Sequence, residues 1–399
     1  MIYGLPFATQ RFFRTTMLDA FGITNTQLGD MFAVYGITAM FSYFFGGPFA
    51  DRYSARSLIV VSLVLTAAGG VYMATIPGVW QMSALYGFWG VTTSFLFWAA
   101  LIKATRDWGG TSSQGIAFGI LDGGRGLASA SFGAIAVGIL ALYLPAEYAL
   151  ATGDDRRAAL GSIILYYAAI TLLCAVITWF LVPHDETTVS RKRNPFAGVR
   201  EVSRNPLVWA QASIIICAYC GYKGLDNMQL YAVQVLGMNE VNAARLATYG
   251  VYVRPVACII AGLVADRFDS ARSILALFIV LFAAYAILGV FTPDTIALTA
   301  IYGSLFVTFF AVFALRAIYY ALLEETRIPK HLTGASIAVI AFVGYTPEVF
   351  FGPVSGRILD ADPGVGGHLD YFTFLGVVAI AGILLTVWLI RLKSRRSRA

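Results

Sequence analysis

The sequence predicts an all-α, polytopic membrane protein built from two related helix bundles, and three observations carry this prediction. Hydrophobic residues fill 58% of the 399 positions and charged residues only 13%, with a mean hydropathy of +0.73. Apolar runs long enough to cross a bilayer recur along the whole chain, and one charged loop segment occurs in both halves. Because an average soluble domain carries about 25% charged residues, lipid is the solvent that fits this composition.

The apolar runs define the individual membrane helices. A spanning helix needs roughly 20 predominantly apolar residues, and eleven runs meet this requirement. They cover residues 28–50, 57–77, 80–103, 114–144, 158–183, 206–226, 241–265, 273–292, 295–323, 335–358 and 371–392, after a shorter apolar segment at 1–14.

The first helix is expected to be truncated. Pro206, near the start of the seventh helix, lies 60 positions before Asp266, whereas Met1 lies only 50 positions before the equivalent Asp51. Residues 1–13 would rise only about 20 Å, less than the roughly 30 Å hydrocarbon core. Either the chain begins upstream of Met1 or this helix is naturally short.

Loop charge predicts the orientation in the membrane. If the loop at 51–56 is cytoplasmic, most basic loop residues lie on that side, and the opposite loops hold little beyond Arg14, Arg156 and Arg157. This asymmetry places the central loop 184–205 and the C-terminus in the cytoplasm of an inner-membrane protein. The basic residues on that side are Arg52, Arg56, Lys103, Arg106, Arg191, Lys192, Arg193, Arg200, Arg204, Arg267, Arg272, Arg327, Lys330, Arg391, Lys393, Arg395, Arg396 and Arg398.

The same pattern explains the net charge of +6. Basic residues gathered in short loops between apolar segments indicate membrane topology, so we expect no nucleic-acid partner. The 184–205 loop divides the chain into an N-terminal bundle, 1–183, and a C-terminal bundle, 206–399.

A repeated loop relates the two halves. GGPFADRYSARSLIVVSLVL around Asp51 matches AGLVADRFDSARSILALFIVL around Asp266, 215 positions later, and the same offset pairs Arg11 with Asp226. Internal repeats of this kind build many transporters, with the substrate site at the repeat interface. The glycine and charged positions that the two copies share are Gly47, Asp51, Arg52 and Arg56, and Gly262, Asp266, Arg267 and Arg272.

These eight residues predict a cytoplasmic clasp. The glycines permit close helix approach, the aspartates can accept hydrogen bonds at a helix N-terminus, and the arginines can lock one loop to another. Such a clasp would hold the cytoplasmic side shut and open during transport. The alternative is that the charges only fix topology.

The duplicated loop resembles the signature of the major facilitator superfamily between helices two and three. This sequence departs from it by one extra residue before Arg56 and two before Arg272. The resemblance covers essentially the whole chain. It implies two pseudo-symmetric six-helix bundles, secondary transport by alternating access, no enzymatic activity and no cofactor.

Within the superfamily, three segments resemble the organophosphate–phosphate antiporter branch. They are Tyr222-Lys-Gly-Leu-Asp226, Trp108 to Gly126, and Glu324 to Tyr345. The paired substrate arginines of that branch would fall near Ala8 and Gly221, and its helix-five histidine at Asp122. The sequence therefore departs from the branch at its substrate-binding positions.

Charged residues inside predicted spans are the candidate functional residues. Arg125, Arg254 and Arg316 lie 11 or 12 residues from the cytoplasmic ends of their helices, which is about 16–18 Å and close to the midplane. Charges at this depth are costly unless they face a cavity or a partner. The others are Arg11, Asp122, Lys223, Asp226 and Glu348, the last beside Pro347.

The signs of these charges predict an anionic substrate. Asp122 with Arg125 and Lys223 with Asp226 are i,i+3 pairs that could neutralise each other, which leaves Arg11, Arg254 and Arg316 against Glu348. A guanidinium offers a fork for carboxylate, sulfate or phosphate. The substrate-binding candidates are Arg11, Arg125, Lys223, Arg254 and Arg316; the proton-coupling candidates are Asp122, Asp226 and Glu348.

The remaining features argue against enzyme or metal chemistry. The sequence has no Walker A, HExxH or GxSxG motif. Its four cysteines lie inside apolar runs, so we expect no metal site. We expect a monomeric transporter of a small organic anion; the alternatives are an exporter of amphiphilic compounds and a non-transporting membrane sensor.

Overall fold

The computed structural model describes residues 2–50, 52–110, 114–145, 150–183, 199–322 and 333–396, and every regular element in this part is helical. The N-terminal bundle comprises η1 (Gly4–Ala8), α1 (Thr9–Phe12), α2 (Arg14–Phe21), α3 (Asn25–Ala50), α4 (Ala55–Met73), α5 (Val79–Val91), η2 (Thr92–Trp98), α6 (Ala99–Gly109), α7 (Gln114–Tyr143) and α8 (Gly153–Leu181). After α9 (Val199–Val202), the C-terminal bundle comprises α10 (Pro206–Gly224), η4 (Leu225–Asn227), α11 (Met228–Gln234), α12 (Glu240–Phe268), α13 (Ser270–Val290), α14 (Leu298–Ile318), α16 (Thr333–Gly344), α17 (Pro347–Ala361) and α18 (Val365–Arg396).

The predicted membrane helices are present. Nine helices of the described part are long and apolar enough to cross a bilayer. The predicted spans 28–50 and 206–226 correspond to α3, which begins three residues earlier, and to α10, which ends two residues earlier. The all-α, polytopic fold class is therefore confirmed, and the central segment 184–198 lies outside the described residues.

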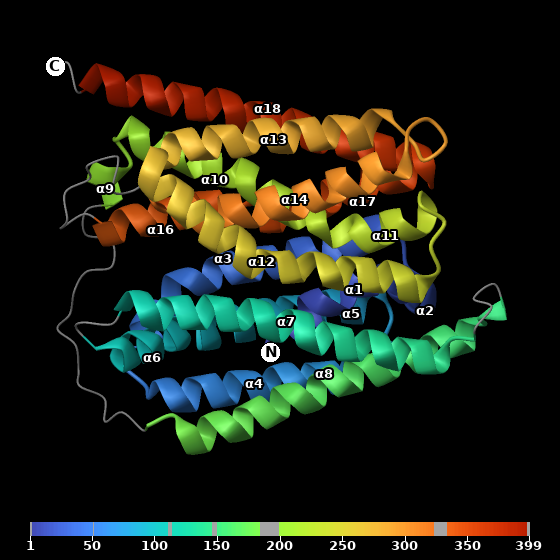
Figure 1. Cartoon of the computed structure of the whole chain (residues 1–399). Helices are drawn as coiled ribbons and strands as arrows, with labels where there is room; N and C mark the ends of the chain where they lie inside the picture. The colour runs from blue at the N-terminus through green and yellow to red at the C-terminus, as the bar shows by residue number, and fades with distance from the viewer. Residues whose placement is uncertain are drawn as a thin grey trace.

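The helices form two bundles that meet along two helix pairs. The N-terminal bundle, blue to green, lies beside the C-terminal bundle, yellow-green to red (Figure 1). Across the interface α17 packs on α3 and α12 packs on α7. The first residues of α3 and α12, Asn25 and Glu240, lie 215 positions apart, so the sequence offset relates structurally equivalent helices.

The first helix extends beyond the predicted segment 1–14. The run η1, α1 and α2 reaches Phe21, with one irregular residue at Phe13. Arg11 and Arg14 both lie within this run. Both arginines are buried, and they have partners inside the protein: Arg11 donates to Asp226, and Arg14 donates to Gln10 and Asn25.

Glycines allow α3 and α17 to touch backbone to backbone. A Cβ atom built on Gly29 would clash with the Gly352 carbonyl oxygen, and one on Gly36 would lie 2.6 Å from the Glu348 backbone. Side chains at these positions would push the bundles apart, because small residues are what permit such close helix contact.

Gly29→Ala is therefore expected to destabilise this arrangement by about 1–3 kcal/mol, the usual effect of overpacking. The melting temperature of the purified protein measures the effect. Gly138→Ala on α7 is the matched control, because no atom lies within 4 Å of its added methyl group and alanine favours a helix by about 1 kcal/mol. Equal melting temperatures for Gly29→Ala and the parent protein would contradict the close packing.

Candidate functional site

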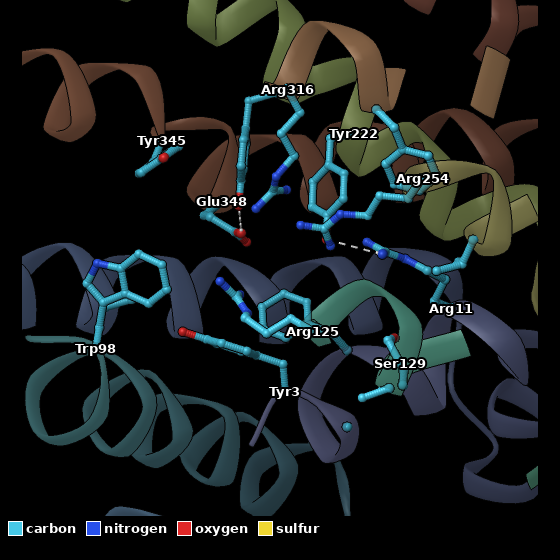
Figure 2. A pocket seen from close by; sticks show the side chains of 18 of the residues that line it. Tyr3, Arg11, Trp98, Arg125, Ser129, Tyr222, Arg254, Arg316, Tyr345 and Glu348 are labelled. Carbon is cyan, nitrogen blue, oxygen red and sulfur yellow. Dashed lines mark hydrogen bonds between the residues drawn. The ribbon is translucent and has the colours of Figure 1, made fainter. Parts of the chain in front are cut away.

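A cavity of about 440 Å³ lies between the two bundles, a volume within the usual range for small-molecule sites. Both bundles contribute walls: η1, α1, α3 and α7 from the first, and α10, α12, α14 and α17 from the second. Figure 2 shows the charged and aromatic side chains that converge on it. The cavity thus lies at the interface of the repeats.

Charged side chains of mostly one sign line this cavity. Arg11, Arg125, Arg254 and Arg316 are cationic, and Glu348 is the carboxylate among the lining residues that the structure describes. The structure brings all five together from five separate helices. Lys223 and Asp226 do not line the cavity.

Four charges form a buried network beside the cavity. Arg11 Nε donates to Asp226 Oδ1 at 2.6 Å, and Lys223 Nζ lies 3.1 Å from Asp226 Oδ2 and 3.3 Å from Glu348 Oε2. None of these side chains is more than 12% exposed. Two cations meet two carboxylates, so the network is neutral as a whole.

This network corrects the sequence-based pairing of charges. Lys223 and Asp226 do pair, but Arg11 joins them and Glu348 also binds Lys223. The Tyr219 hydroxyl donates to Glu348 as well. Arg11 is therefore already matched by a carboxylate, and it contributes less excess positive charge than the sequence suggested.

The contact between Arg11 and Asp226 follows from the internal symmetry. Their positions differ by 215, which is the repeat offset. Two symmetry-equivalent positions can touch only where they lie close to the pseudo-twofold axis. The sequence paired these residues as repeat equivalents, and the structure shows that they are also bonded to each other.

Lys223 is packed behind the cavity wall. Its Nζ lies 5.0 Å from the ring centroid of Phe7 and 4.5 Å from that of Phe32, and its side chain is 3% exposed. Cation–π contact and two carboxylates stabilise the ammonium there. In this conformation Lys223 orients Glu348 and Asp226 and has no direct access to the cavity.

Arg316 reaches the cavity with little compensation for its charge. Its guanidinium carbon lies 3.8 Å from the ring centroid of Tyr222 and 5.6 Å from that of Tyr219. Nη1 is buried and forms no hydrogen bond with any described residue. Within the described part of the chain Arg316 has no carboxylate within ion-pair distance. A buried group of this kind is suited to bind an anion.

The other two cavity arginines contact aromatic rings. Arg125 lies 5.3 Å from the ring of Trp98 and 5.6 Å from that of Tyr3. Arg254 lies 6.0 Å from the ring of Phe313. The side chain of Asp122 lies outside the described residues, so its predicted pairing with Arg125 stays a prediction.

The sequence reading did not single out Tyr3 or Tyr219, which both line the cavity. Tyr219 could have been found by helical spacing, because Tyr219, Tyr222 and Asp226 lie on one face at i, i+3 and i+7. Tyr3 lies in the short predicted segment 1–14 and gives no comparable signal.

The predicted clasp residues lie where α3 and α12 end and where α4 and α13 begin. Arg56 stacks on Trp179 of α8, with 4.8 Å between guanidinium carbon and ring centroid. Arg52, Asp266, Arg267 and Arg272 are exposed, and Gly262 is partly exposed. Asp51 and the surroundings of Gly47 lie outside the described residues. A gating role for these residues stays a prediction.

The second copy of the loop uses a different aspartate at the helix start. Asp269, and not Asp266, accepts hydrogen bonds from the backbone N–H groups of Ala271 (2.9 Å) and Arg272 (3.2 Å), because Asp266 still belongs to α12. Lys393 of α18 also donates to Asp269 at 3.2 Å. Burial alone would raise the pKa of Asp269, but these donors outweigh it and lower that pKa below its usual value.

The family follows from the sequence match. The chain matches the model of the Major Facilitator Superfamily over residues 1–353. It belongs to this superfamily. The superfamily assignment accounts for the two helix bundles, the duplicated loop and the cavity between the bundles, and it makes the chain a member of a family of membrane transporters.

Two relatives from Escherichia coli (strain K12) align over nearly their whole length. The inner membrane protein YihN is 25% identical over 415 aligned positions, which cover 100% of this chain and 94% of the relative. The inner membrane protein YqcE is 23% identical, with 96% and 90% covered.

Solved structures share the fold. A bacterial homologue of the human lysosomal transporter Spinster, in an inward-facing and occupied conformation, has a TM-score of 0.69 at 15% identity and covers 99% of this chain and 95% of its own. The nucleoside transporter NupG has a TM-score of 0.71 at 12% identity, with 98% and 97% covered. At these identities the likeness concerns the fold alone.

Proposed function

We propose that this protein is a secondary active transporter that moves a small organic anion across the inner membrane by alternating access. The observation that carries the proposal is Arg316, whose buried guanidinium faces the cavity without a carboxylate among the described residues. A bound anion would supply the missing partner, and a guanidinium can hold a carboxylate, sulfate or phosphate with two hydrogen bonds.

The charge balance of the cavity supports an anion. The network of Arg11, Lys223, Asp226 and Glu348 is neutral, so it adds no net charge. Three arginines remain on the lining, namely Arg125, Arg254 and Arg316. Of these, Arg316 has a buried Nη1 that forms no hydrogen bond with a described residue, and uncompensated charge inside a membrane protein is costly.

Glu348 is the strongest candidate for coupling transport to protons. It lines the cavity and also bonds Lys223 and Tyr219. A change in its protonation would therefore act on the substrate space and on the buried network together. Asp226 and Asp122 remain secondary proton-coupling candidates, and substrate exchange without protons is the alternative mode.

We infer that the cavity opens toward the cytoplasm under the proposed topology. The bonds between the bundles gather where α2 meets α11 and where α3 meets α17. The lining extends away from that end, to Met40 and Tyr43 on α3. If the 51–56 loop and the C-terminus lie in the cytoplasm, as the loop charges predict, this side of the cavity is the inner one.

An exporter of amphiphilic compounds is the second candidate. The aromatic lining favours it, since rings can stack on apolar solutes. Arg316 argues against it, because a cationic or neutral amphiphile would supply no anionic partner for its buried guanidinium. The aromatic lining residues are Tyr3, Phe7, Phe12, Tyr35, Tyr43, Trp98, Tyr167, Tyr219, Tyr222, Phe313 and Tyr345.

A thermal-shift screen followed by uptake tests the proposal. The purified protein is heated with small anions (succinate, gluconate, glycerol phosphate, a sugar sulfonate), with the neutral compounds glycerol and glucose, and with the amphiphilic cation tetraphenylphosphonium. A ligand of the native state raises the melting temperature by mass action. We expect a shift from at least one anion and its uptake into proteoliposomes. Stabilisation and transport of the amphiphilic cation alone would favour the exporter, and binding without transport would favour a sensor.

A further inference from the structure

One end of the interface is closed by two anionic side chains of the C-terminal bundle that bind residues of the N-terminal bundle. This end, called the α2–α3 end here, contains the turn between α2 and α3, the start of α12 and the end of α17. In Figure 1 it lies on the right, where α2 and α11 end. It is opposite to the duplicated clasp loops.

Asp360, in the last turn of α17, binds the start of α3. Its Oδ2 accepts from the backbone N–H of Thr26 at 2.7 Å. Its Oδ1 accepts from the backbone N–H and the side-chain Nδ2 of Asn25, at 3.2 and 3.0 Å. The first N–H groups of a helix have no partner within the helix, and the helix dipole favours an anion there. A carboxylate of the C-terminal bundle thus caps a helix of the N-terminal bundle.

A buried cation strengthens the hold on Asp360. Arg14 is 4% exposed, and its Nε donates to Asn25 Oδ1 at 2.9 Å while Nη1 donates to Gln10. Asn25 therefore bridges Arg14 to Asp360. Removing the charge of Asp360 would leave both the helix start and Arg14 with less anionic compensation.

Glu240 makes a second contact between the bundles. It is the first residue of α12 and corresponds to Asn25 by the repeat offset. Its carboxylate accepts from the Thr16 hydroxyl at 2.6 Å and from Arg156 Nε at 2.7 Å, both in the N-terminal bundle. The Glu240 side chain is 6% exposed, so these bonds are shielded from water.

A third contact contributes less. Arg357 of α17 binds Asp30 of α3 at 2.9 Å, but the two side chains are 57% and 50% exposed. Exposed ion pairs have small net effects because water and salt screen them. The bonds of Asp360, which is partly buried, and of Glu240, which is buried, therefore dominate the closure.

We propose that Asp360 and Glu240 are gating residues that form an anionic latch between the bundles at the α2–α3 end. The inference rests on the proposed alternating access, because a cavity that opens toward this end requires the bundles to part there and every one of these bonds to break. The latch stabilises the closed form of this end. In the resting state, the cavity is therefore open toward the clasp loops and closed at the α2–α3 end.

The test measures the separation of the bundles directly. Spin labels are placed at Asp154 on α8 and Asp294 between α13 and α14, both exposed at this end, after replacement of the four native cysteines. Double electron–electron resonance then gives the distance distribution in detergent or nanodiscs. Asp360→Asn replaces a carboxylate oxygen with an amide that faces N–H donors, and Glu240→Gln weakens the second contact. We expect the ratio of long to short distances to rise about tenfold or more in each variant.

Matched variants separate gating from folding. Asp362 lies two positions beyond Asp360 on an exposed site, so Asp362→Asn is expected to leave the distances unchanged. Arg357→Gln is expected to shift the distances slightly. Asp360→Glu is expected to keep much of the population at the short distance. A purely structural role would lower the melting temperature without moving the distances. Unchanged distances in folded Asp360→Asn and Glu240→Gln would overturn the latch. The readout uses no substrate, so its outcome is separate from that of the anion proposal.

Discussion

Arg316→Ala is expected to reduce binding of the transported anion about 100-fold and to abolish detectable uptake. The variant removes a buried guanidinium that faces the cavity, and a charge-assisted hydrogen-bond pair contributes about 1.5–3 kcal/mol. Arg316→Lys should retain part of the affinity, because the ammonium keeps the charge and loses the two-pronged geometry. Binding is measured by ligand-induced thermal shift and uptake in proteoliposomes, with the anion found in the screen.

The control for this prediction is Arg245→Ala. Arg245 lies on α12 and is exposed, with its Nη1 on Asn242, so its removal should change neither binding nor uptake. Retained binding in folded Arg316→Ala would remove the central support for an anion site. Equal losses in both variants would show a nonspecific effect of net charge.

Asp226→Asn is expected to destabilise the protein by about 3–5 kcal/mol, the usual effect of removing one partner of a buried ion pair. The Asp226 side chain is 7% exposed, and its carboxylate offsets part of the positive charge of both Arg11 and Lys223. Glu348 still binds Lys223, so the larger loss falls on Arg11. Chemical unfolding in detergent measures the change in free energy.

A double-mutant cycle isolates the contact near the pseudo-twofold axis. Arg11→Gln alone should also be destabilising, and the double variant should lose less stability than the two single losses combined, since the pair is already broken. Asp370→Asn, on an exposed site of α18, is the matched control and should be neutral. Additive losses would show that Arg11 and Asp226 do not stabilise each other.

The sequence determined the helices and the superfamily. Hydrophobicity and length decide which segments cross a bilayer, and both are readable one segment at a time. The duplicated loop around Asp51 and Asp266 revealed the internal repeat, and charges inside apolar helices pointed to Arg125, Arg254, Arg316 and Glu348. All four of these charged residues line one cavity.

The partners of the charges were decided by the tertiary structure. Spacing along one helix predicted Lys223 with Asp226, but only the placement of the bundles about their common axis brings Arg11 to the same carboxylate. The same holds for Asp360, which caps a helix that begins 335 positions earlier. Hydrophobic periodicity shows which face of a helix is buried. It carries no information about which other helix covers that face. The charge network, the latch and the partner of Arg11 could therefore be identified only in the folded protein.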